Sequence, residues 1–334
     1  KRQQLGCLQR VHCVPRPASP MKRHLVLLIH GMNPDASPGD PSLDILHFFN
    51  QVRDSSAHLV SRLPDSHVLP IRWGHPDALV PAGAGGSRPD LLLMQAQNHI
   101  LSRMYPQGPI GSAPSMEWMA SKLHAALLIP GIGDMIYFIG SDGYAQIRDL
   151  IYNQSLIPRV MEFAGNDTVC LHIIAISLGV TIAHEFLRGI FSDEAHLEHG
   201  VGAFSDLRHM VGQHRLELGS LICAASQLPL LLLRSGLVVE TMAAGGLLDP
   251  AEIGLRESRQ QWLLFHDEND LLSLPTRALY RQDAQAGSIE EVRVVNEHGS
   301  LGFVASHTGY WRNPVVQEKT RQCLLAATEH WVDF

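Results

Sequence analysis

Continuous runs of apolar residues along the chain predict six strands of a sheet. Val, Ile and Leu dominate these runs, without the regular alternation of apolar and polar residues. A strand has this pattern when helices cover both faces of its sheet, which is typical of parallel sheets. The predicted strands span residues 24–30, 68–73, 169–176, 218–224, 261–266 and 289–295.

Apolar residues at helical spacing lie between these strands. In 180–187 they recur every three or four residues, so a helix directly follows the strand 169–176. Asp40 or Ser42 is the expected N-cap of another helix, which runs to about residue 63. This alternation predicts an α/β protein with a mostly parallel central sheet flanked by helices. Further helices are predicted at 134–163 and 314–331.

One section, at about 75–140, lacks the alternation of strand and helix. Two helical patterns within it, 91–104 and 116–128, are separated by a stretch rich in proline and glycine. An insertion of this kind between a strand and a helix is typical of a cap or lid over an active site. Residues 21–334 are therefore expected to form a single domain with a helical cap insertion.

A serine stands at the abrupt boundary between the strand 169–176 and the helix after it. Because the turn is so short, the hydroxyl of Ser177 is expected at the carboxyl end of the sheet. The amino terminus of the helix points free N–H groups and a partial positive charge at the same place. This position suits a nucleophile that carries an acyl group and then releases it. In the alternative interpretation, Ser177 is only the N-cap of the helix.

The segment from Ala175 to Gly179, AISLG, resembles the nucleophile elbow G-x-S-x-G of the α/β-hydrolase superfamily. Ala175 replaces the first glycine with another small residue, which the crowded turn requires. The resemblance covers about 22–332 and is strongest at HGM (30–32), AISLG and SHTGYW (306–311). It implies an α/β-hydrolase fold and a serine esterase or lipase-like enzyme of the bacterial kind.

The same resemblance implies an acid in the loop after the strand 261–266. Two aspartates compete for this role. Asp270 is favoured because an apolar residue and then a proline-bearing segment follow it. Asp267 is the alternative, and Glu268 is a more distant one.

A histidine is implied just before the last helix. His307 is favoured because it stands in a His-x-x-Tyr-Trp arrangement, and His298 is the competing candidate. Ser177, Asp270 and His307 occur in the chain order that this fold requires, which weighs against a mere capping role for the serine. In the implied mechanism His307 takes the proton of the attacking hydroxyl, and Asp270 orients the imidazole.

The resemblance also implies an oxyanion hole. The His-Gly pair at 30–31 is similar to the pair that supplies one backbone donor in this family. The N–H groups of Met32 and Leu178 would then hold the developing oxyanion, each contributing about 3 kcal/mol. His30 itself is expected to be structural.

The expected activity is hydrolysis of carboxylic esters through an acyl-enzyme intermediate. A lactonase, a thioesterase or a peptidase would use the same three residues, and a non-catalytic binding protein on this fold is a further alternative. A haloalkane dehalogenase is disfavoured, because its nucleophile would be an aspartate where Ser177 stands.

Composition and charge narrow the possible partners. The net charge of −7, without a basic stripe that contains aromatic residues, disfavours nucleic-acid binding. The histidines at 196, 199, 209 and 214 match no zinc-binding spacing, so no metal is expected, and the proposed chemistry needs no cofactor. The expected partner is a small-molecule ester.

The cysteines and the first 20 residues bear on the compartment. Five cysteines, at positions 7, 13, 170, 223 and 323, show no paired spacing, which favours a reducing environment. Residues 1–20 are basic and contain prolines, but lack the apolar core of a signal peptide. No run reaches the length of a membrane-spanning helix. A cytoplasmic protein is expected, with residues 1–20 as a disordered or foreign extension before Met21; a short targeting arm is the alternative.

Overall fold

The computed structural model describes seven stretches of the chain, which carry the sheet and the helices around it. The predicted cap insertion at 75–140 and the extension at 1–20 lie outside the described residues. The described residues are 22–31, 41–71, 149–192, 204–233, 236–282, 287–296 and 306–329.

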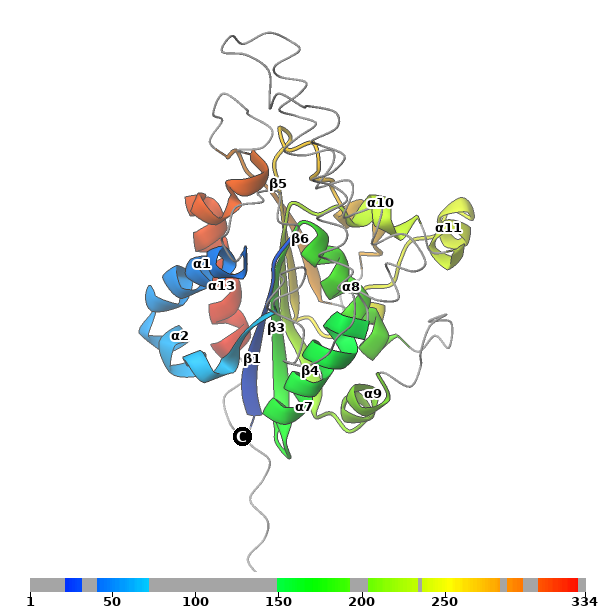
Figure 1. Ribbon diagram of the computed structural model, residues 1–334. Coiled ribbons are helices and arrows are strands. Elements are labelled where there is room, and N and C mark those ends of the chain that lie inside the picture. The colour runs from blue at the N-terminus through cyan, green and yellow to red at the C-terminus, as the bar shows by residue number, and fades with distance from the viewer. Residues whose placement is uncertain are drawn as a thin grey trace, which may run out of the picture.

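A six-stranded sheet with the order β2-β1-β3-β4-β5-β6 forms the centre of the molecule (Figure 1). Every neighbouring pair of strands is parallel. All six predicted strands are confirmed, with ends that shift by a few residues, and so is the predicted α/β architecture. The strands are β1 (Lys22–Ile29), β2 (Val68–Ile71), β3 (Thr168–Ile176), β4 (Leu216–Ala224), β5 (Gln261–His266) and β6 (Ser288–Arg293).

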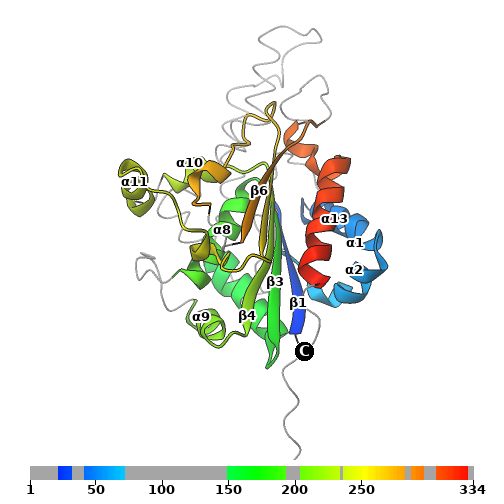
Figure 2. The same cartoon turned by 180° about the vertical axis from the view of Figure 1, so that it is seen from behind.

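Helices cover both faces of this sheet, as the two opposite views show (Figures 1 and 2). One face carries α1 (Pro41–Asp54), α2 (Ala57–Arg62) and α13 (Pro314–Glu329). The other face carries α7 (Ile157–Ala164), α8 (Leu178–Phe191) and α9 (Ser205–Gly212).

Strand β1 shows why these strands are apolar without alternation. Leu25, Leu27 and Ile29 belong to the core under α7 and α8. Val26 and Leu28, which point to the opposite face, belong to the core under α1 and α13. Because successive side chains enter two different cores, a polar residue on either side of the strand would be buried.

The single helix predicted up to residue 63 is wrong, because two serines interrupt it. The Ser55 hydroxyl donates to the Val52 carbonyl oxygen at 2.6 Å, at the end of α1. Ser56 has an extended backbone, and its hydroxyl accepts from the N–H of Leu59, so it caps α2. Ser42, one of the two predicted N-caps, is the second residue of α1 rather than its cap.

Shorter elements connect the main ones. The helical return predicted before β3 is confirmed from residue 149 onward, where a π-helical segment leads into α7. The shorter connecting elements are η1 (Asp65–His67), η3 (Asp149–Leu156), α10 (Leu228–Leu232), α11 (Gly236–Ala243), η4 (Pro250–Ile253), η5 (Arg277–Leu279) and η6 (Tyr310–Arg312).

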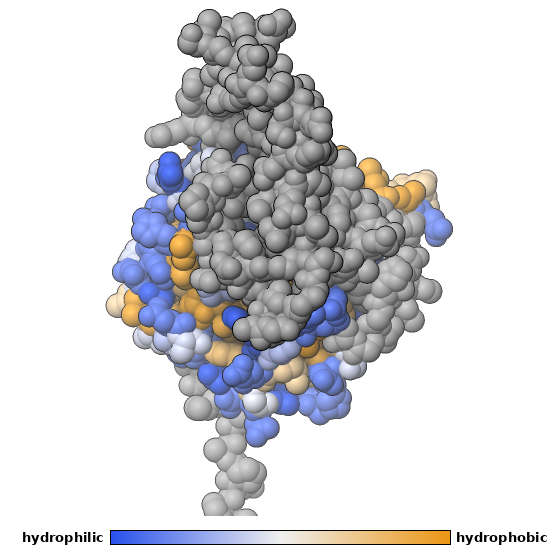
Figure 3. Space-filling model, in the orientation of Figure 1, coloured by the Kyte–Doolittle hydropathy of each residue, from blue (hydrophilic) through white to orange (hydrophobic). Residues whose placement is uncertain are grey.

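The region of α10 and α11 exposes several large apolar side chains. On the face in Figure 3, apolar residues show at the upper right, over these helices. The exposed side chains of Leu230, Leu233 and Val239 lie in this region. Among the helices of the described stretches, none has both the length and the apolar character needed to cross a bilayer.

Candidate active site

Ser177 forms a one-residue turn between β3, which ends at Ile176, and α8, which begins at Leu178. Its backbone has φ 55° and ψ −128°, a conformation that costs a non-glycine residue on the order of 1–3 kcal/mol. The side chain is 2% exposed, and it makes no capping hydrogen bond to α8. A capping role therefore does not account for this serine.

Two glycines allow the turn to pack against the end of β1. A Cβ atom on Gly179 would lie 2.4 Å from the carbonyl oxygen of Ile29 and 2.5 Å from that of His30. A Cβ atom on Gly31 would lie 2.6 Å from the Cβ atom of Ser177. Only glycine fits at these two positions. The close approach of the two backbones therefore explains why the HG segment and the AISLG segment each contain a glycine there.

His307 connects the serine to an acid. Its Nε2 atom lies 3.1 Å from the Ser177 Oγ atom. Its Nδ1 atom lies 3.0 and 2.9 Å from the two carboxylate oxygens of Asp270. Both side chains are buried, so the three predicted residues form one continuous hydrogen-bonded array.

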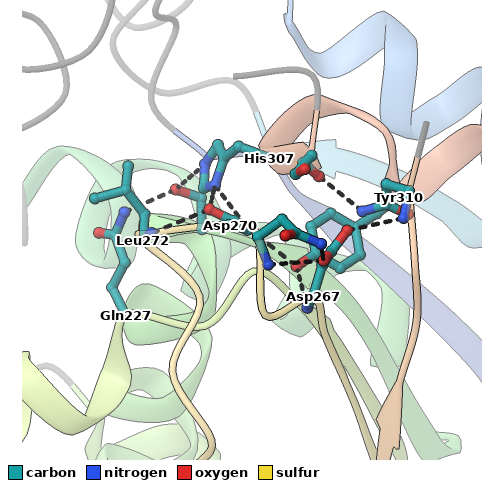
Figure 4. A network of polar contacts seen from close by, with 10 residues as sticks. Gln227, Asp267, Asp270, Leu272, His307 and Tyr310 are labelled. Carbon is teal, nitrogen blue, oxygen red and sulfur yellow. Dashed lines mark hydrogen bonds and ion pairs between the residues drawn. The ribbon is translucent and has the colours of Figure 1, made fainter. Parts of the chain in front are cut away.

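The two aspartates after β5 face different partners (Figure 4). Asp270 contacts His307 and also accepts the N–H of Leu272 at 3.0 Å. The carboxylate of Asp267 instead accepts the backbone N–H groups of Asn269 and Asn296, at 2.9 and 2.8 Å. The structure thus brings Asp270 to the histidine and leaves Asp267 to hold the loop.

Glu268 was a further candidate for the acid, and His298 was the competing candidate for the histidine. The carboxylate of Glu268 pairs with Arg293 at 2.6 Å, and both side chains are largely exposed. His298 lies outside the described residues.

Tyr310 is hydrogen-bonded to the acid and was missed as a site residue from sequence. Its hydroxyl donates to the Oδ2 atom of Asp270 at 3.1 Å and accepts the backbone N–H of Asp267 at 2.9 Å. Burial, and then the negative charge of Asp270, raise the pKa of the Tyr310 hydroxyl, so it remains a protonated donor. The His-x-x-Tyr-Trp pattern contained this residue, but did not reveal its contact.

A pair of asparagines holds the segment that carries His307. The Nδ2 atom of Asn296 donates to the carbonyl oxygen of Ser306 at 2.7 Å. The Nδ2 atom of Asn313 donates to the Oδ1 atom of Asn296 at 2.9 Å. These buried bonds fix the backbone next to the histidine from two other elements.

Gln227 is the second residue that sequence reasoning missed. Its Nε2 atom donates to the Ser177 Oγ atom at 3.2 Å, and its side chain is 1% exposed. The sequence predicts an irregular segment from residue 227 onward that could border the substrate pocket. It contains no signal that distinguishes this amide from its neighbours. Its position just past the carboxyl end of β4, in the same sheet as β3, explains the contact.

The predicted oxyanion donors are only partly described. Leu178 is the first residue of α8, and N–H groups at this position have no partner within their own helix. Met32 lies outside the described residues, although Gly31 before it packs against Ser177. The ring of His30 is buried, and its Nδ1 atom lies 2.6 Å from the Gly31 carbonyl oxygen.

Possible metal-ligand atoms lie elsewhere, in the lower part of the sheet. Among the described residues, His24, Cys170 and His172 have such atoms within 4.8 Å of one another. Their imidazoles are already joined to each other at 3.0 Å, and His172 is joined to the Ser220 hydroxyl at 2.9 Å. Both ring nitrogens of His172 are thus engaged in hydrogen bonds within the protein. Of the four histidines considered from sequence, those at 196 and 199 lie outside the described residues.

The described cysteines behave as small buried apolar residues, as predicted for Cys170 and Cys223. Both are free thiols, and so is Cys323. Burial raises the pKa of the Cys223 and Cys323 thiols to about 12, so they stay protonated and unreactive at neutral pH.

Comparison with models of protein families, with curated proteins and with solved structures finds no match for this chain. The fold defines an α/β protein with an all-parallel sheet flanked by helices. The site within it is a buried Ser-His-Asp array at the carboxyl ends of β3 and β5.

Proposed function

We propose that this protein is a serine hydrolase of the α/β-hydrolase superfamily that cleaves carboxylic esters through an acyl-enzyme intermediate. The observation that carries the proposal is the hydrogen-bonded path from Ser177 through His307 to Asp270. A serine is a weak nucleophile by itself, and a base within hydrogen-bond reach that a third group orients is what activates it.

The position of the array in the fold supports the same proposal. The serine follows β3, the acid follows β5, and the histidine precedes α13. All three lie at the carboxyl ends of parallel strands, where open α/β sheets bind their ligands. The strained backbone of Ser177 is a further sign, because such conformations persist where function requires them.

The proposed reaction starts with attack of the Ser177 Oγ atom on the ester carbonyl carbon. His307 accepts the hydroxyl proton at Nε2 and then gives it to the departing alcohol. Asp270, bound to Nδ1, keeps the imidazole in the tautomer whose Nε2 atom accepts, and stabilises the imidazolium. Water, deprotonated by the same histidine, then attacks the acyl-enzyme and releases the acid.

The oxyanion in this proposal forms beside the amino terminus of α8. The N–H of Leu178 is one donor, and the N–H of Met32 is the second one predicted from sequence. Donors fixed in the backbone need no reorganisation when charge develops, which makes them effective in the transition state.

An ester is the proposed substrate because the Ser-His-Asp array can attack a carbonyl carbon with its own side chains and without a cofactor. Helix α10 begins directly after Gln227 and exposes Leu230, so we propose that it offers an apolar surface to the hydrocarbon chain of the ester. The cap insertion at 75–140 and the cytoplasmic location remain predictions from sequence.

Hydrolysis of p-nitrophenyl esters from acetate to palmitate tests this proposal. We expect turnover by the wild-type protein, and a loss of roughly 10⁴-fold or more in Ser177→Ala and His307→Ala. Ser205→Ala, at an exposed position on α9, is the matched control and should retain full activity. A fluorophosphonate probe should label Ser177, as read by mass spectrometry of the modified peptide.

Each other outcome decides between the alternatives. Intact ester hydrolysis in Ser177→Ala would overturn the proposal. Labelling of Ser177 without ester turnover would keep the serine hydrolase and point to a lactone or thioester. Neither labelling nor turnover would favour a non-catalytic binding protein.

A further inference from the structure

Gln227 contacts the proposed nucleophile, yet the mechanism above does not use it. Its amide nitrogen lies 3.2 Å from the Ser177 Oγ atom. Its amide oxygen is buried and has no hydrogen-bond partner among the described residues. A buried acceptor without a partner is unfavourable in a folded protein. A hydrogen-bond donor on a bound ligand would remove this cost for the amide oxygen of Gln227.

The orientation of this amide follows from the array itself. The Nδ1–H of His307 donates to Asp270, so its Nε2 atom must accept the Ser177 hydroxyl proton. The Oγ atom can then only accept from a third neighbour, and only the NH₂ end of Gln227 can donate to it. The carbonyl oxygen of the amide is thereby turned away from the serine, about 2.3 Å from the nitrogen by standard bond geometry.

The loop that carries Gln227 is tightly built. Ala225, at the end of β4, has a φ of 52°, an unfavourable value for a residue with a Cβ atom. The Ser226 carbonyl oxygen accepts the N–H of Leu274 at 2.9 Å, and its hydroxyl accepts from the Thr276 hydroxyl at 3.3 Å. These contacts tie the loop to the segment after Asp270, so the amide is held in place relative to the acid as well as the serine.

We propose that Gln227 is a specificity-determining residue whose carbonyl oxygen, without a partner among the described residues, accepts a hydrogen bond from a hydroxyl or amide N–H on the acyl group of the substrate. This rests on the proposed function of the site. The acyl group is the part concerned, because it becomes bonded to Oγ, the atom that the amide contacts, while the leaving group departs toward His307. The preferred substrates are esters of hydroxy acids or of N-acylated amino acids.

Paired p-nitrophenyl esters test this preference with a common leaving group. One pair is butyrate against 3-hydroxybutyrate, and the other is isobutyrate against the N-acetylalanine ester. We expect kcat/KM to favour the member with the donor in at least one pair, by about 10- to 100-fold. The pair that shows the preference identifies the donor as a hydroxyl or an amide.

Gln227→Met keeps the length of the side chain but removes its donor and acceptor. We expect the ratio within the pair to fall close to 1, mainly through loss of kcat/KM for the donor-bearing ester. Gln227→Asn, which retains the amide but withdraws it by one methylene, should lose the preference too. Gln213→Met, at an exposed position after α9, is the matched control and should leave the ratio unchanged.

Fluorophosphonate labelling separates this inference from the proposed function. Labelling of both Gln227 variants, with the preference lost, supports the recognition role. An unchanged ratio in both variants, or no preference in the wild-type protein that is labelled, overturns it. A wild-type protein without labelling or turnover overturns the proposed function, and with it this role.

Discussion

Asp267 and Asp270 follow the same strand and are both buried, but their carboxylates are engaged differently. Both oxygens of Asp267 accept from backbone N–H groups, one from Asn269 in its own loop and one from Asn296 in the segment after β6. Those of Asp270 accept one backbone N–H, that of Leu272, but also face the imidazole of His307 and the hydroxyl of Tyr310. A carboxylate that backbone donors occupy fixes the loop, whereas one bound to a side chain can orient that side chain. Asp267 thus has a structural role, and Asp270 has the proposed catalytic one.

Removing the hydroxyl of Tyr310 tests this division. In Tyr310→Phe the Asp270 carboxylate and the Asp267 N–H each lose a buried partner. We expect ester kcat/KM to fall about 10-fold, and the free energy of unfolding to fall by about 1–3 kcal/mol. Urea unfolding and steady-state kinetics measure the two effects separately.

Tyr280→Phe is the matched control for this variant. Tyr280 is equally buried, and its hydroxyl is hydrogen-bonded to His184, away from the array. It should lose similar stability but retain activity. Equal losses of activity in the two variants would show that Tyr310 acts only through general stability.

At the scale of elements, the turn from β3 into α8 depends on how closely β1 approaches. The carbonyl groups of Ile29 and His30 lie where a side chain at position 179 would begin. These groups belong to the backbone at the end of β1 and cannot rotate away, as the end of a flexible side chain could. A larger residue at 179 must therefore displace the amino terminus of α8, and Ser177 and Leu178 with it.

Gly179→Ala is expected to lose both stability and activity. The added methyl group would overlap backbone oxygens, which costs about 1–3 kcal/mol or more. Ester hydrolysis and probe labelling should drop together, because the shift moves the nucleophile. Gly212→Ala, in α9 with open space around its Cβ position, should be neutral or slightly stabilising. Wild-type labelling in Gly179→Ala would contradict the packing account of the turn.

The elements differ in how far sequence alone could predict them. The strands were predicted because double burial leaves a continuous apolar run. The break between α1 and α2 was missed because it depends on local hydrogen bonds of Ser55 and Ser56, which helical spacing does not encode. Gln227 and Tyr310 were missed because each contacts a residue 50 or 40 positions away in the chain. Asp270 could be favoured over Asp267 by pattern, but only the fold shows which carboxylate faces the histidine.

In the molecule as a whole, the sheet carries a second buried polar group away from the proposed site. His24 near the start of β1, His172 within β3 and Ser220 of β4 form a hydrogen-bonded chain across three strands. The ring of His172 fits between the strands because Gly219, beside it, lacks a side chain, at the point where the register of β3 and β4 shifts. Burial lowers the pKa of His172 well below its usual range, and burial and then Arg62 lower that of His24 to about 4.

These histidines predict that stability falls as the pH is lowered below neutrality. In the unfolded chain a histidine takes up its proton near pH 6.5, while folded His24 remains neutral down to about pH 4. The unfolded state therefore binds more protons between these two values, and its free energy falls relative to the folded state. From pH 7 to pH 5 we expect His24 alone to remove about 2 kcal/mol from the free energy of unfolding.

Urea unfolding of the wild-type protein and two variants at pH 7 and pH 5 measures this contribution. His24→Asn places an amide near the position of the Nδ1 atom but has no titrating group, so its stability should change less between the two pH values. His209→Asn, at an exposed position on α9, is the control and should show the wild-type difference. The carboxylates of the protein titrate equally in all three chains, so they cancel in the comparison. An equal pH dependence in wild type and His24→Asn would mean that the buried histidine is protonated in the folded state, and that the chain of neutral imidazoles is wrong.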